Sequence, residues 1–288
     1  MYIRSIDCEI EISRKIGGIE EDFARRYIPE IEFGGRGKDA FIDWEMGKQV
    51  EILEVKFGKR DYFRIRAGNP QPYKNEHPYF FILQVFSRLY EKKGHILLTD
   101  SAVFSQGKKG ILLLGPPHSG KSTLMVLAAS QGFDLLSNEN SVFDLRNEKL
   151  IFIGGCNLLT FSPMVKRYVE IEEDGKTRSG YGMLDLRKFE RRKVRIEKIY
   201  YLHSSFSSKG FDKELIRGRK IEKILWDHAS KVVSGGEFYK KFPLNFSTPE
   251  LSKKRAIKVR EMARGYKNKF FEVFGSHIEI FNEIAKEI

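Results

Sequence analysis

The chain has 288 residues, enough to bury one large hydrophobic core or two of ordinary size, and we expect two domains. Its 51 Lys and Arg outnumber its 39 Asp and Glu, and the net charge of +12 favours an anionic partner (nucleotide, nucleic acid or anionic membrane surface) or reflects a highly charged, thermophile-like surface. The two cysteines, Cys8 and Cys156, exclude a disulfide scaffold and a cysteine zinc site. No apolar run approaches the roughly 18 residues that span a bilayer, which excludes a membrane-spanning helix. Both observations favour a cytoplasmic protein.

Residues 1–75 are predicted to form a β-rich N-terminal region. Apolar and polar side chains alternate through residues 2–12, as they do in a half-buried strand. Further strands are expected at 49–55 and 62–66, with glycine-containing turns at 34–38 and 58–61.

A helix and a strand are expected next. Pro78 suits a helix start, residues 79–92 show helical spacing of large apolar side chains, and Gly94 suits the helix end. Residues 96–104 read as a buried strand, and the polar turn 106–110 leads into the next one. A hairpin at this point is unusual for a simple alternating β-α fold.

A phosphate-binding loop, or P-loop, follows the apolar strand 111–114. Residues 115–123 read Gly-Pro-Pro-His-Ser-Gly-Lys-Ser-Thr, and 124–129 continue as a helix, so the G-x-x-x-x-G-K-[ST] pattern of a Walker A motif has the strand–loop–helix context that it requires. Main-chain N–H groups and the helix N-terminus attract phosphate, Lys121 reaches the outer phosphates, and Ser122 holds Mg²⁺. A glycine turn with a chance lysine is the alternative. The predicted nucleotide contacts are Gly115, Ser119, Gly120, Lys121, Ser122 and Thr123.

Two carboxylates are candidates for chemistry beside this loop. Glu139 ends the predicted strand after the P-loop helix, where an oxygen ligand for Mg²⁺ is needed, and Asp144 is the second choice. Asp100 lies in the strand before the P-loop hairpin, where it could orient or deprotonate an acceptor hydroxyl. A surface glutamate in a turn and an aspartate that caps a turn are the structural alternatives.

Arg178 is a candidate to neutralise transition-state charge, because it precedes a glycine turn, although an exposed arginine in a charged segment is the more common case. His118, inside the loop, is given no role.

The rest of the chain is predicted to complete a core at 76–210 and a helical C-terminal region at 211–288 that packs on it. Residues 198–202 form a clear buried strand. Helical faces are expected at several positions after 213, the last of them made by Phe270, Phe274, Ile278, Phe281 and Ile284.

Four segments together resemble a known family. Residues 96–104, 110–124 and 131–139 give a strand with a catalytic position, a hairpin, the P-loop and a strand ending in polar residues, and 178–186 add a glycine turn into a strand. In this order, over about residues 76–205, the chain resembles the C-terminal catalytic domain of HPr kinase/phosphorylase and its serine-kinase-like relatives. The resemblance implies an α/β fold of the phosphoenolpyruvate-carboxykinase-like P-loop type, with a mixed twisted sheet.

The chain departs from that family at its site residues. The family's histidine base aligns with Thr99 or Asp100, its paired aspartates align with Asn138 and Glu139, and Arg178 is displaced by one residue from the family's arginine. No recognition stretch for HPr is visible. A different hydroxyl acceptor is therefore expected.

The resulting expectation is a kinase that transfers the γ-phosphoryl of ATP or GTP, with Mg²⁺, to a hydroxyl of a small molecule, a protein serine or RNA. Asp100, Lys121 and Arg178 are its predicted catalytic residues, and Ser122 and Glu139 its predicted metal ligands. A nucleotide-binding regulator without catalysis and a nucleic-acid-associated NTPase remain alternatives, and a homo-oligomer is possible.

Overall fold

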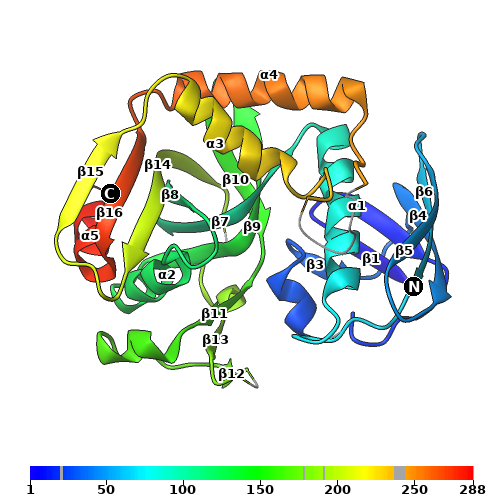
Figure 1. The fold of residues 1–288 in the computed structure, drawn as a ribbon, viewed down its shortest axis with the longest axis horizontal. Helices are drawn as coiled ribbons and strands as arrows, with labels where there is room; N and C mark the ends of the chain where they lie inside the picture. The colour runs from blue at the N-terminus through cyan, green and yellow to red at the C-terminus, as the bar shows by residue number, and fades with distance from the viewer. Residues whose placement is uncertain (20–21, 178, 191, 237–243, 288) are drawn as a thin grey trace.

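A computed structural model describes residues 1–19, 22–177, 179–190, 192–236 and 244–287. The chain is a mixed α/β protein built on two large sheets that lie side by side, with helix α1 between them (Figure 1). None of the helices in these ranges is long and apolar enough to cross a membrane.

The N-terminal sheet has six strands in the order β3-β1-β2-β4-β6-β5. Burial alternates along β2, β4 and β6, so one face is buried while the other faces water. The strands are β1 (Tyr2–Ser5), β2 (Cys8–Ile12), β3 (Ile31–Phe33), β4 (Ala40–Met46), β5 (Glu51–Lys56) and β6 (Asp61–Ala67), and the 3-10 helix η1 (Asp22–Arg26) precedes β3.

Helix α1 (His77–Lys93) covers the buried face of this sheet. Pro78 lies in its first turn, and Gly94 caps its end in the left-handed conformation (φ 86°), as the sequence predicts. Its apolar side chains pack in one cluster with those of β2, β4 and β6, and this cluster also includes Leu97 and Val142 of the second sheet. The N-terminal sheet is therefore joined to the rest of the chain by apolar packing.

The second sheet has seven strands in the order β10-β9-β7-β8-β14-β16-β15. Strands β8, β14 and β16 are parallel to one another, and the remaining neighbours are antiparallel. Strand β10 also pairs with the start of β14, so the sheet curls toward closure. Its strands are β7 (Ile96–Gln106), β8 (Lys109–Leu114), β9 (Asp134–Arg146), β10 (Lys149–Gly155), β14 (Val194–Ser205), β15 (Phe211–Leu215) and β16 (Phe270–Ser276).

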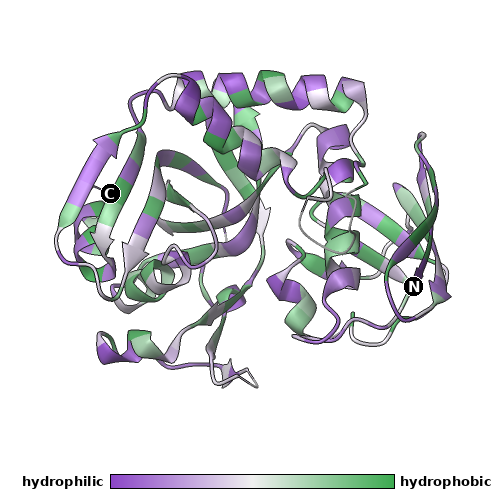
Figure 2. Ribbon diagram, in the orientation of Figure 1, coloured by the Kyte–Doolittle hydropathy of each residue, from purple (hydrophilic) through white to green (hydrophobic). Residues whose placement is uncertain are grey.

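Two helices cover each face of this sheet. Alternate residues of β8 show the division: Leu112 and Leu114 pack in the cluster formed with α3 and α4, whereas Ile111 and Leu113 pack with α2 and α5. Figure 2 shows the edge strand β15 as mostly hydrophilic, which protects the sheet edge from further pairing. The helices are α2 (Lys121–Ser130), α3 (Arg219–Ser230), α4 (Pro249–Gly265) and α5 (His277–Ala285).

A small three-stranded sheet, β11-β13-β12, follows β10. It consists of β11 (Leu158–Phe161), β12 (Gly175–Lys176) and β13 (Gly182–Asp185), with the 3-10 helices η2 (Pro163–Arg167) and η3 (Leu186–Lys188) beside it.

Two expectations about local structure are wrong. Residues 2–12 form a hairpin rather than one strand, because Ile6 (φ 59°) lies in the turn between β1 and β2. Phe270 and Phe274 do not belong to a helix: Phe270–Ser276 is strand β16, which pairs in parallel with β14, and the helix begins only at His277. Together with β15, this strand makes the C-terminal region part of the sheet rather than a purely helical addition.

Candidate functional site

The P-loop connects β8 to α2 at the end of the curled sheet. Gly115 (φ 153°) and Gly120 (φ 93°) both adopt backbone conformations that favour glycine. A Cβ at Gly120 would overlap Ser204 Oγ and lie 2.7 Å from His277 Cε1. The second motif glycine is therefore required by its neighbours as well as by its own φ.

The N-terminus of α2 supplies the donors for an anion. Intrahelical bonding begins with Leu124 N, which donates to Gly120 O over 3.0 Å, so the amides of Lys121, Ser122 and Thr123 have no partner in the helix. The Ser119 amide is already used, since it donates to Pro116 O. The first turn of α2 is therefore the principal main-chain anion site.

Lys121 is folded onto its own loop. Its Nζ donates to Gly115 O (2.7 Å) and Pro116 O (2.9 Å), with Ser119 Oγ at 3.4 Å. The side chain is buried, and this burial lowers the pKa of Lys121 below its usual value. The ammonium therefore lies where it could exchange loop carbonyls for phosphate oxygens.

The carboxylates of Asp100 and Glu139 are brought to this loop by adjacent strands. In the β7–β9 ladder Thr99 pairs with Asn140 and Ser101 with Glu139, so Asp100 is the extra residue of a β-bulge. Both Asp100 (φ 50°) and Glu139 (φ 70°) are left-handed, which is uncommon for residues other than glycine. Bulges of this kind re-aim side chains and concentrate next to functional sites.

Each carboxylate has a cationic partner that is distant in sequence. Lys231, which follows α3, donates to Asp100 Oδ2 over 2.6 Å. Arg26 of η1 places Nη2 3.7 Å from Glu139 Oε1. The site therefore pairs two carboxylates of the second sheet with cations from η1 and from the end of α3.

His228 of α3 forms a hydrogen bond to the backbone of β7 next to the bulge. Its Nδ1 lies 2.6 Å from the carbonyl oxygen of Thr99, so this nitrogen carries the proton and donates. Burial, the largest influence, lowers the pKa of His228, which favours the neutral ring. A histidine from another part of the chain is thus hydrogen-bonded to the residue before Asp100.

A second histidine supports the P-loop. Ser204 Oγ donates to Ser119 O over 2.7 Å, and His277 Nδ1 lies 2.7 Å from Ser204 Oγ. Since the serine proton is used toward Ser119, His277 Nδ1 donates to Ser204. Burial lowers the pKa of His277 to about 4.

These groups surround one cavity of about 590 Å³. Its size lies within the range of small-ligand sites. The walls come from the P-loop, the two bulged strands, the starts of α1 and α5, and η1. Lining residues include Arg26, Tyr27, Glu76, Phe80, Leu83, Thr99, Asp100, His118, Gly120, Lys121, Ser122, Thr123, Glu139, Tyr181, Ser204 and His277.

The donor set fits a magnesium–nucleotide complex. Ser122 and Glu139 offer oxygen ligands at the same cavity, and Mg²⁺ bound to nucleotide phosphates takes only one or two ligands from protein. Within the described ranges no group of three or more His, Cys, Asp and Glu side chains could hold a metal ion. A magnesium ion here would accordingly depend on the phosphates for further ligands.

The other predicted candidates lie elsewhere. Asp144 is 2.6 Å from His95 Nδ1 and does not line the cavity. Arg178 lies outside the described residues, although Tyr181, three positions later, lines the cavity. Sequence reasoning missed the contributors from η1 and the C-terminal half, because no local motif marks them; these are Arg26, Ser204, His228, Lys231 and His277.

Comparisons with known proteins add one distant likeness. No protein-family model matches the sequence, and neither does any curated protein. Among solved structures the chain is similar to the HPr(Ser) kinase/phosphatase from Coxiella burnetii, at 18% identity and a TM-score of 0.25, over 42% of this chain and 77% of that one. Since so low a TM-score carries no functional inference, function is inferred below from the residues around the cavity.

Proposed function

We propose that the protein is a P-loop phosphotransferase that moves the γ-phosphoryl of ATP or GTP to a hydroxyl group, on a fold of the phosphoenolpyruvate-carboxykinase-like type. The observation that carries the proposal is the meeting of Lys121 and the first turn of α2 with Asp100 and Glu139 at one cavity. A P-loop by itself is shared by many activities. The two carboxylates at the cavity, Asp100 at the β-bulge and Glu139 opposite its neighbour, are what favour transfer to an acceptor.

Different residues at the cavity are proposed to bind the phosphates, the metal ion and the transferring phosphoryl group. The amides of Lys121, Ser122 and Thr123, together with the Lys121 ammonium, hold the β- and γ-phosphates. Ser122 and Glu139 would hold Mg²⁺, which would offset phosphate charge when bound. Arg178, which precedes Ser179 and Gly180 in the sequence, is proposed to add positive charge to the transferring group.

Asp100 is proposed to act on the acceptor. It accepts the hydroxyl proton as the acceptor oxygen forms its bond to the γ-phosphorus, and the bond from that phosphorus to the bridging oxygen breaks, which leaves the diphosphate. Lys231 holds the carboxylate in place through its 2.6 Å ion pair. Because that ion pair also occupies Asp100, a nucleotide-binding regulator without transfer is a second candidate.

Nucleotide binding is tested by titration calorimetry of magnesium–ATP and magnesium–GTP into the full chain. Lys121→Ala should abolish the binding heat with little change in melting temperature, because the variant loses phosphate contacts but no apolar packing. The exposed Lys108, on the turn before β8, provides the matched control, and Lys108→Ala should bind as the wild type does. Unchanged affinity in Lys121→Ala would exclude the proposed site.

Transfer is tested separately with nucleotide labelled in its γ-phosphate. Asp100→Asn should retain nucleotide affinity and slow transfer by a factor on the order of 10². Tight nucleotide retention with no transfer in the wild type would favour the regulator.

A further inference from the structure

The half of the cavity that faces the N-terminal sheet is not needed to bind nucleotide phosphates. It is built from η1 and the start of α1, which contribute Arg26, Tyr27, Glu76, Phe80 and Leu83. These residues lie far from the P-loop in sequence, and they line the same cavity. An acceptor that receives the phosphoryl group must therefore bind beside the nucleotide in this cavity.

Arg26 carries the positive charge in this half of the cavity, and its guanidinium lies near three aromatic rings. Its central carbon lies 5.4 Å from the ring centre of Tyr27, 5.6 Å from that of Phe23 and 5.8 Å from that of Tyr73. Stacking of this kind fixes the plane of the guanidinium at little entropic cost. The group is thus preorganised before any ligand arrives.

The hydrogen-bonding capacity of Arg26 is only partly used by the described residues. Nη1 is 3.5 Å from the Tyr73 hydroxyl, Nη2 is 3.7 Å from Glu139, and Nε is buried with no hydrogen-bond partner there. The Arg26 side chain is partly accessible, at 22%, and a guanidinium with such long contacts at its terminal nitrogens is suited to a planar or tetrahedral anion. When Glu139 binds Mg²⁺ instead of Arg26, Nη2 of Arg26 also becomes available to an anion.

The surrounding wall is rigid and largely apolar. The Tyr27 ring stacks on Tyr79 at 5.2 Å and meets Phe80 edge to face. Glu76, the one acidic group of this wall, already accepts bonds from the Tyr27 hydroxyl and the Tyr73 amide. Its carboxylate is therefore occupied in fixing the wall.

Arg26 and the proposed base Asp100 line the same cavity. Glu139, which lies 3.7 Å from Arg26, pairs across the ladder with Ser101, the neighbour of Asp100. An acceptor that meets both groups must fit within this cavity of about 590 Å³.

We infer, resting on the proposed function, that the acceptor is a small hydroxyl compound carrying a carboxylate or phosphate group, with that anion bound by Arg26 and its hydroxyl directed to Asp100. Tyr27 and Phe80 contact the carbon chain between them.

The test supplies the full chain with magnesium and γ-labelled ATP, and with three fractions of a cell extract. These are small molecules retained by an anion-exchange resin, small molecules that pass through it, and the macromolecular retentate. Label should enter only the resin-retained small molecules. Pretreatment of that fraction with phosphatase removes the acceptor if its anion is a phosphate and spares it if it is a carboxylate.

Label in the pass-through or macromolecular fraction would overturn the inference. That outcome would leave the phosphotransferase activity itself standing. An absence of label in every fraction, with or without nucleotide binding, would instead remove the proposed function, so the two failures are distinguishable.

Variants then locate the anion site. Arg26→Gln should raise the KM for the labelled acceptor by about tenfold or more and change the KM for ATP by less than about twofold. Arg26→Lys keeps the positive charge but lacks the planar donor arrangement of a guanidinium, so the KM for the acceptor should rise less than in Arg26→Gln. This variant also controls for a folding defect. Arg14, an exposed residue in the bend after β2, gives the charge-matched control Arg14→Gln. A fall in kcat with unchanged KM, or parallel changes in both KM values, would place Arg26 on the nucleotide and contradict the inference.

Discussion

Gly120 shows how one residue is constrained by both the loop and the surrounding fold. Its φ of 93° favours glycine, and any Cβ would meet Ser204 and His277. Gly120→Ala should therefore abolish nucleotide binding and lower the melting temperature. Gly132 has a similar φ of 81° but open space around it, so Gly132→Ala should cost only about 1 kcal/mol. Equal effects in calorimetry and thermal unfolding would show that contact with Ser204 and His277 is unimportant.

His277 should make the protein sensitive to acid. Its pKa in the folded chain is about 4, below the ordinary value of 6.5, so the unfolded chain takes up the proton first as pH falls. The resulting loss of stability develops between pH 6.5 and 4 and is absent above that window. His277→Asn keeps an N–H for Ser204 but cannot titrate. Its melting temperature, measured across this window, should fall less than that of the wild type, and identical slopes would contradict the assignment.

At the scale of elements, a buried ion pair joins α1 to Asp61, the first residue of β6. Asp61 and Arg88 are both almost fully buried, with Arg88 Nε 2.9 Å from Asp61 Oδ2 and Lys92 Nζ 3.2 Å from the same oxygen. Removal of one partner leaves the other charge uncompensated. Asp61→Asn should therefore lower the free energy of unfolding in urea by about 3 kcal/mol. Asp43→Asn, which alters an exposed carboxylate 4.0 Å from Arg64, should change it by less than about 0.5 kcal/mol.

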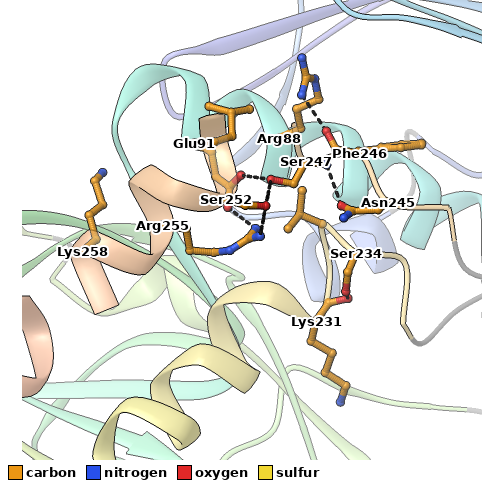
Figure 3. Close-up of polar contacts among 12 residues, drawn as sticks. Arg88, Glu91, Lys231, Ser234, Asn245, Phe246, Ser247, Ser252, Arg255 and Lys258 are labelled. Atoms are coloured by element: carbon orange, nitrogen blue, oxygen red, sulfur yellow. Dashed lines mark hydrogen bonds and ion pairs between the residues drawn. The ribbon is translucent and has the colours of Figure 1, made fainter. Parts of the chain in front are cut away.

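At the scale of the whole molecule, a polar network joins the N-terminal cluster to the helices over the second sheet (Figure 3). Glu91 of α1 accepts from Arg255 of α4 over 2.5 Å, and Ser247 bonds to Glu91 and Ser252. Arg88 also donates to Phe246 O over 2.7 Å, which fixes the segment before α4 onto α1. In Figure 3 Lys231 extends away from this network, consistent with its contact to Asp100.

This polar network should couple the stability of α1 to that of α4. Glu91 and Arg255 are nearly inaccessible, so Glu91→Gln and Arg255→Met should each cost about 3 kcal/mol, whereas the double variant should cost much less than their sum. Denaturant unfolding of the four proteins measures this coupling. Strict additivity would mean that Glu91 and Arg255 stabilise their own elements independently.

The sequence by itself determined the features that depend on neighbouring residues. The P-loop lies between its strand and helix as predicted, and α1 has Pro78 and Gly94 at its ends, because loop geometry, helix starts and helix caps are set over a few positions. The approach of Asp100 and Glu139 to the P-loop was also foreseeable, since both lie in strands adjoining it in sequence.

Only the tertiary structure decided the partners of those residues. Arg26, Lys231, His228 and His277 reach the site from segments that no local pattern connects with the P-loop. Phe270–Ser276 has apolar spacing that suits a helix, but pairing with β14 makes it a strand, because long-range hydrogen bonding and packing outweigh local preference. Short-range geometry therefore specified the end of the cavity around Lys121, whereas contacts between segments distant in sequence built the end around Arg26.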